Sequence, residues 1–216
     1  MAAHGGQAGA ARRSDRATAA AAALAALALC GLSACQTRMP PPASAWPERR
    51  AALQAVAQFT FAGRMAAATA SEGFSASVNW QQQGLNSDLT LRSPLGFGGA
   101  HLQFDGTTLQ MTASDGTLLD GAAAHAELVR VFGFEPPLAS LRYWLLGVPD
   151  PAAEASETLD ATQRLQNLQQ LDWQIAYGDY VPEAGFWLPQ RVSLQRGALR
   201  LKLIVTRWQL APGRRS

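Results

Sequence analysis

Apolar and polar residues alternate with a period of two over much of the middle of this chain. The runs cover residues 73–81, 89–92, 100–105 and 109–113. Such alternation is typical of β-strands that bury one face and expose the other to water. Asp105-Gly106 and Asp115-Gly116 follow two of the runs, and Asp-Gly pairs between alternating segments favour hairpin turns. The pattern therefore predicts an antiparallel meander with one apolar face.

A second group of strands is predicted toward the C-terminus. The clearest run is 199–205, in which leucine and valine occupy every second position. Trp208 and Leu210 continue the apolar series in the opposite phase, which predicts a β-bulge between Val205 and Arg207. Earlier apolar positions that we assign to strands are Leu171, Trp173, Ile175, Tyr177, Val192 and Leu194.

Helical spacing of apolar residues occurs in three short places. Residues 47–58 begin with a proline, which suits the first turn of a helix, and two further short helices are predicted within 121–149. One sheet with one apolar face needs a cover, and three short helices can cover a long sheet only in part. A curved sheet would then keep an apolar hollow suited to a lipid-like ligand. Complete filling by the helices is the alternative, and periodicity does not separate the two.

The N-terminal 34 residues read as a secretory leader. Three arginines precede an apolar run over 17–29, and the run ends on the sequence LSAC at residues 32–35. This ending resembles the bacterial lipoprotein box, in which a peptidase cuts before the cysteine and Cys35 carries the lipid. The alternative is a permanent membrane-spanning helix over 17–34. We favour the lipoprotein, because alanine is weakly apolar and the segment ends at the box rather than at a basic flank.

Removal of the leader changes the charge of the chain. Residues 35–216 carry a formal net charge of zero, because the leader holds three arginines and one aspartate. We therefore expect no basic patch of the kind that binds nucleic acid. No cysteine remains for a disulfide once Cys35 is acylated. We predict a Pro-rich tether over 35–45, up to about 30 Å long, and a single domain over 46–216.

Signals for catalysis are sparse. His101 and His125 lack partners at metal-ligand spacing, and His101 falls on the polar face of a predicted strand. The chain has no G-x-S-x-G nucleophile elbow and no G-x-x-x-x-G-K-[ST] phosphate loop. We therefore expect a protein that is not an enzyme and that needs no metal or cofactor.

Several segments, taken in order, resemble the LolB family of outer-membrane lipoprotein receptors. They are GFSASVNWQQ, SPLG, LRYWLLGVPDP, WQIAYGDY and the C-terminal amphipathic strand. The resemblance implies an unclosed antiparallel β-barrel with a helical lid over an apolar cavity, similar to the periplasmic carrier LolA. It also implies that the protein accepts acylated lipoproteins from a LolA-like carrier and inserts them into the inner leaflet of the outer membrane. We expect a monomer anchored through Cys35 to the periplasmic face of that membrane, with no nucleic-acid partner.

The resemblance and the apolar strand faces together define the candidate site residues. Those expected to line the cavity are Phe74, Ala76, Val78, Trp80, Leu89, Leu91, Leu102, Phe104, Leu141, Trp144, Leu145, Trp173 and Ile175. The loop Pro94, Leu95, Gly96 and Phe97 is expected to enter the membrane, because Leu95 matches the family's protruding leucine and Phe97 adds apolar surface. Two other functions remain open: an outer-membrane scaffold with a filled barrel, and a lipid hydrolase.

Overall fold

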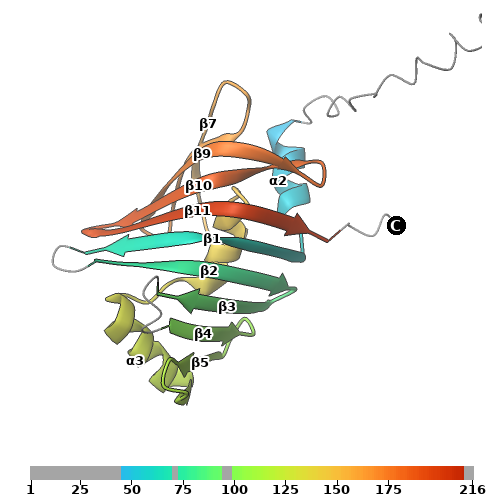
Figure 1. Cartoon of the computed structure of the whole chain (residues 1–216). Coiled ribbons are helices and arrows are strands. Elements are labelled where there is room, and N and C mark those ends of the chain that lie inside the picture. The colour runs from blue at the N-terminus through green and yellow to red at the C-terminus, as the bar shows by residue number, and fades with distance from the viewer. Residues whose placement is uncertain (1–44, 70–72, 94–98, 212–216) are drawn as a thin grey trace, which may run out of the picture. The chain divides into compact units, whose positions relative to one another are not determined.

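The computed structural model describes residues 45–69, 73–93 and 99–211, which form one antiparallel sheet with three helices (Figure 1). The strands are β1 (Gln58–Ala68), β2 (Gly73–Gln83), β3 (Asn86–Arg92), β4 (Gly99–Phe104), β5 (Leu109–Ala113), β6 (Leu118–Asp120), β7 (Ser156–Leu159), β8 (Leu165–Gln170), β9 (Trp173–Glu183), β10 (Phe186–Arg196) and β11 (Leu199–Leu210). Their order in the sheet is β6-β5-β4-β3-β2-β1-β11-β10-β9-β8-β7. The sheet is not closed, because β6 and β7 form its two edges. The predicted mainly-β, unclosed antiparallel fold is confirmed.

The hairpins and the bulge lie where the sequence predicts them. β4 and β5 pair around Asp105, whose carboxylate accepts hydrogen bonds from the backbone N–H groups of Thr107 and Thr108. In the pair β1–β11, Ala62 lies opposite Arg207 and Gly63 opposite Val205, so one extra residue bulges from β11. Gly63 fits this approach because a Cβ there would lie 2.5 Å from the carbonyl oxygen of Ile204.

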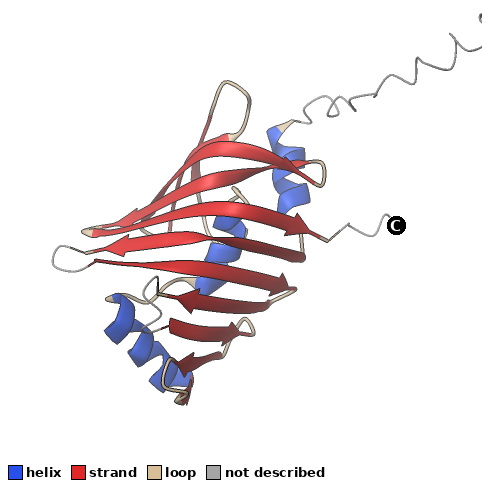
Figure 2. Ribbon diagram, in the orientation of Figure 1, coloured by secondary structure: helices blue, strands red, loops and turns tan. Residues whose placement is uncertain are grey.

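The helices are α2 (Trp46–Gln54), α3 (Gly121–Phe132) and α4 (Leu138–Leu145) (Figure 2). Helix α3 packs beside β5 and β6 at one edge of the sheet. Helix α2 is held near the other edge, where the Trp46 indole N–H donates to Glu157 over 2.6 Å. Among the described residues, no helix has the length and apolar character needed to cross a bilayer.

Two sequence-based expectations about elements are wrong, and three short strands were not predicted. Helix α2 ends at Gln54 rather than at residue 58, because Gln58 already pairs with Gln83 in the sheet. Leu171 lies in the turn between β8 and β9, with a positive φ of 51° and 49% of its surface exposed. The short strands β6, β7 and β8 were not anticipated.

A buried amide fixes the C-terminal end of α4. The side-chain oxygen of Gln170 accepts from the Trp144 indole N–H over 2.7 Å and from the Asp150 backbone N–H over 2.9 Å. Its amide nitrogen donates to the carbonyl oxygens of Asp150 and Ala153, each over 2.8 Å. Gln170 is 2% exposed and uses all four of its hydrogen-bonding positions. The amide therefore ties α4 and the following turn to β8.

Candidate functional site

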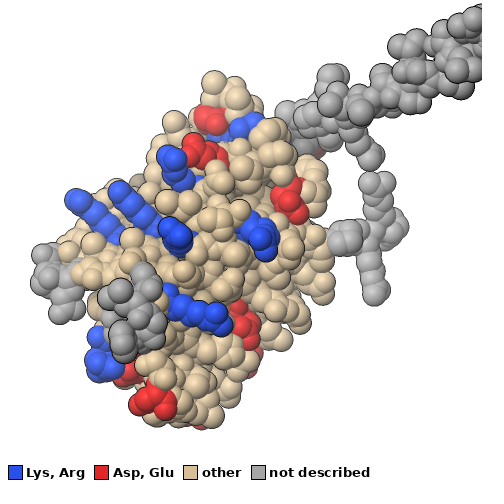
Figure 3. Space-filling view, viewed as in Figure 1, with Lys and Arg blue, Asp and Glu red and all other residues tan. Residues whose placement is uncertain are grey.

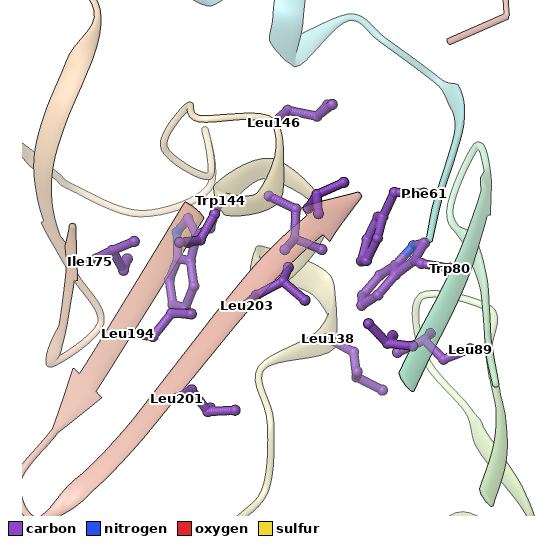
Figure 4. Close-up of a cluster of buried hydrophobic side chains, with 14 of the residues drawn as sticks. Phe61, Trp80, Leu89, Leu138, Trp144, Leu146, Ile175, Leu194, Leu201 and Leu203 are labelled. Atoms are coloured by element: carbon purple, nitrogen blue, oxygen red, sulfur yellow. The ribbon is translucent and has the colours of Figure 1, made fainter. Parts of the chain in front are cut away.

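An apolar cavity of about 90 Å³ lies between the inward face of the sheet and helices α3 and α4. The inward residues of the strands form one wall: Phe61, Met65, Val78, Trp80, Leu89, Leu91, Leu102, Leu194, Leu201 and Leu203. The helices and the segment between them form the other: Leu128, Phe134, Pro136, Leu138, Leu141 and Leu145. Figure 4 shows Phe61, Trp80 and Leu203 among the side chains gathered near Leu138. Every lining residue is apolar, so only a hydrophobic ligand suits this space.

The alternation of each strand explains why these side chains meet. Val78 and Trp80 are two residues apart on β2, and their cross-strand neighbours on β3 are Leu91 and Leu89. All four are less than 8% exposed. The Trp80 indole N–H donates to the buried Gln82 side chain over 2.9 Å, so its polar atom is satisfied away from the cavity.

The residues expected to line a cavity fall into two groups. Those on the cavity wall are Val78, Trp80, Leu89, Leu91, Leu102, Leu141 and Leu145. The others are absent from its lining: Phe74, Ala76, Phe104, Trp144, Trp173 and Ile175. Trp144 and Trp173 pack against each other, with ring centres 6.1 Å apart, and both are at most 1% exposed. Phe74 and Phe104 are only partly buried.

Several lining residues were not in the sequence-based set. Phe61 and Met65 come from β1, and Leu201 and Leu203 from β11. The alternation of β11 was visible in the sequence, but its position beside β1 depends on strand order rather than on periodicity. Phe134 and Pro136 come from the segment between α3 and α4, where no periodic signal marks a lining residue.

Ionisable groups with shifted pKa values lie outside this cavity. Backbone N–H groups of Thr108 and Thr107 lower the pKa of the Asp105 carboxyl in its turn. Burial raises the pKa of the Tyr180 hydroxyl, which donates to the backbone carbonyl of Leu165. His101 faces outward as predicted, and its Nε2 lies 2.9 Å from the Asp88 carboxylate. Within the described ranges, no group of His, Cys, Asp and Glu has the arrangement of a metal site.

The two other candidate features lie outside the described residues. These are Cys35 and the loop residues Pro94 to Phe97. The ends of that loop are described: Arg92 pairs with Gly99, so the loop connects the adjacent strands β3 and β4. The turn between β5 and β6 and the turn between β8 and β9 lie at the same end of the sheet. Leu118, the first residue of β6, and Leu171, in the β8–β9 turn, are exposed there.

A family comparison identifies the group to which this arrangement belongs. The model of the family described as "Outer membrane lipoprotein LolB" matches residues 57–208, which include most of the sheet and all of the cavity wall. The chain belongs to the LolB family. The predicted resemblance is therefore confirmed.

Individual LolB proteins and solved structures agree with the assignment. The outer-membrane lipoprotein LolB of Azoarcus sp. (strain BH72) is 36% identical over 179 residues, which cover 83% of this chain and 90% of that protein. LolB of Alkalilimnicola ehrlichii is 34% identical over 186 residues, with coverages of 84% and 92%. A LolA superfamily protein from Nitrosomonas europaea shares the fold with a TM-score of 0.53 at 9% identity, over 78% of this chain and 94% of that one.

Proposed function

We propose that this protein is an outer-membrane receptor that accepts lipoproteins from a LolA-like periplasmic carrier and inserts them into the inner leaflet. In this proposal Cys35 carries the lipid anchor, and the acyl chains of the cargo enter the cavity under α3 and α4. The observation that carries it is a wholly apolar cavity between a curved sheet and its helices, in a member of the LolB family.

The energetics of lipid transfer support a binding protein rather than an enzyme. Each methylene removed from water contributes about 0.8 kcal/mol, so the acyl chains of one lipoprotein represent tens of kcal/mol. Release into water is therefore far too slow for transport. Direct hand-over between apolar cavities avoids that step and needs no nucleotide.

The cavity must enlarge before it holds acyl chains. Its 90 Å³ is well below the roughly 300–1,000 Å³ typical of small-molecule sites. The contacts of α3 and α4 with the cavity are apolar and non-directional, whereas the C-terminal end of α4 is fixed by Gln170. Opening therefore involves α3 and the segment 133–137 more than the end of α4.

The small volume also suits a second function, an envelope scaffold whose barrel stays filled. The two functions differ in one measurement, which is uptake of acyl chains. A filled scaffold would leave the tryptophan fluorescence of the protein unchanged when acylated lipoprotein is added, whereas a receptor would change it, because Trp80 lies on the cavity wall.

Replacing Cys35 with alanine tests whether the anchor and the binding site are separate. We expect the unlipidated protein to be released from the membrane and still to accept lipoprotein from the loaded carrier, since the lipid lies outside the cavity in this proposal. Acceptance is measured by transfer of labelled cargo during incubation of the two soluble proteins. Loss of acceptance would mean that the anchor forms part of the binding site.

Leu95→Glu tests the insertion step, with Leu85→Glu as its matched control. One leucine inserted in a bilayer contributes only about 1.5–3 kcal/mol, which is enough to orient the protein but not to anchor it. We expect Leu95→Glu to keep its melting temperature and cargo acceptance and to lose transfer of cargo to membranes. Leu85 is 64% exposed in the β2–β3 turn at the other end of the sheet, so Leu85→Glu should transfer normally. Normal transfer by Leu95→Glu, or a large fall in its melting temperature, would contradict the insertion loop.

A further inference from the structure

Four adjacent strands in the centre of the sheet contain no acidic residue. Strands β2, β1, β11 and β10 are neighbours in that order, and none of their residues is Asp or Glu. They carry six cationic residues: Arg64, Arg191, Arg196, Arg200, Lys202 and Arg207. The net charge of zero for residues 35–216 therefore conceals a strong separation of charge. Composition could not reveal this cluster, because it does not record where the strands bring charges together.

Most of these cations share the outward face of the sheet. Arg64 lies opposite Ser77 on β2 and Ile204 on β11, and Ser77 in turn lies opposite Arg92 on β3. Lys202 lies opposite Ala66 on β1. We name as the outer basic face the exposed residues Arg64, Arg92, Arg200, Lys202 and Arg207. Figure 3 shows Lys and Arg side chains gathered over the middle of the sheet, with acidic side chains mainly around its margins.

The outer basic face is not neutralised by the protein itself. Within the described ranges, none of its five residues belongs to an ion pair, whereas the nearby Arg191 pairs with Asp179 over 2.9 Å. Cations on neighbouring strands repel one another within the Debye length of about 8 Å. Folding gains nothing from this concentration of like charge, so an external anionic partner accounts for it better.

We infer that the outer basic face binds the anionic headgroups of phospholipids in the membrane to which the protein is anchored. The inference rests on the proposed function for the position of the protein at that membrane. The neighbours of these cations include small or polar residues such as Ala66 and Ser77. Among the residues that the structure describes, Ile204 is the one exposed large apolar side chain on this face. A protein interface normally has an apolar core rich in aromatic residues, whereas headgroups need only accessible cations.

The position of the face agrees with a membrane partner. Arg92 is the last residue of β3, where the predicted insertion loop begins, and Arg200 lies opposite Ala68 at the same end of the sheet. These two cations therefore lie at one end of the outward face, the end at which β3 is joined to β4. The cations would hold the receptor against the membrane.

The test measures binding of the Cys35→Ala protein to vesicles, so that the lipid anchor plays no part. One set of vesicles contains phosphatidylethanolamine alone. The other contains phosphatidylethanolamine and phosphatidylglycerol in equal amounts. The test variant combines Arg64→Gln, Arg200→Gln and Lys202→Gln. The control combines Arg130→Gln, Arg142→Gln and Arg164→Gln, which remove the same charge from α3, α4 and the β7–β8 loop.

We expect the parent, which is the Cys35→Ala protein without further changes, to bind the vesicles with phosphatidylglycerol more tightly than those without it. Salt should weaken that binding. Each cation contributes roughly fivefold to binding at an anionic surface, so the test variant should bind about 100-fold more weakly and the control much less so. Equal binding of parent and test variant, or binding that ignores phosphatidylglycerol, would overturn the inference. If the test variant lost cargo acceptance but kept its vesicle binding, the face would instead bind an acidic protein. Failure of the parent to accept cargo would refute the proposed function and leave the vesicle result intact.

Discussion

Replacing Val78 with aspartate is expected to abolish acyl-chain uptake and to lower the free energy of unfolding by about 4 kcal/mol or more. Val78 is 4% exposed and lies on the cavity wall, between Gly63 of β1 and Leu91 of β3. A carboxylate there has no cation and no hydrogen-bond donor among the apolar residues around it, so burying its charge is costly. Urea denaturation measures the stability, and tryptophan fluorescence with added lipoprotein measures the uptake.

The neighbouring residue supplies the control. Asn79→Asp introduces the same carboxylate at an exposed position of the same strand, so stability should change by no more than about 0.5 kcal/mol and uptake should persist. Val78→Phe adds a third comparison, because the larger side chain fills part of the cavity without adding charge. It should lower the free energy of unfolding by about 1–3 kcal/mol. A folded Val78→Phe protein that still takes up acyl chains at the parental level would show that the ligand lies elsewhere.

Gln170→Leu is expected to destabilise the protein by about 3 kcal/mol or more. The change leaves the Trp144 indole N–H and the Asp150 backbone N–H without partners in a buried site, and it removes the side-chain hydrogen bonds to the carbonyls of Asp150 and Ala153. Each buried polar group left unpaired costs about 1–3 kcal/mol. Urea denaturation would measure the loss of stability, and the near-ultraviolet circular dichroism of the tryptophans would report the change around Trp144.

Gln169 provides the matched comparison for this second prediction. It precedes Gln170 on β8 and is exposed, so Gln169→Leu should leave stability within about 0.5 kcal/mol of the parent. If both variants lose the same stability, the cost comes from β8 itself, and the amide does not hold α4 in place.

The elements that could be predicted from the sequence are those with strict periodicity. β2, β3, β4 and β11 alternate cleanly, and the phase change at Trp208 marks the bulge. The buried residues of β8 are Leu165, Leu168 and Gln170, so they are three and then two residues apart. Its sequence LQNLQQ therefore carries no clear period. Gln170 could not be distinguished from Gln169, because two adjacent glutamines differ only in what the fold places around them.

The candidate site was predictable only in part, for a related reason. Val78, Trp80 and Leu102 lie on the cavity wall because consecutive hairpins keep their phase aligned. Trp173 has the same inward orientation, yet its space is filled by Trp144 and Phe134, which approach from the helical side. The outer basic face depends on β11 lying beside β1, and that pairing joins residues too far apart in sequence for local patterns to reveal.

The pairing of β1 with β11 also has a consequence for how the protein folds. Every other pair in the sheet joins consecutive strands, whereas Phe59 pairs with Leu210 across nearly the whole domain. The meanders β1–β6 and β7–β11 can therefore form from local contacts, and their joining involves the slow closure of a long loop. A chain that emerges N-terminus first exposes the edge of β1 until its last strand arrives, so aggregation competes with folding during that interval.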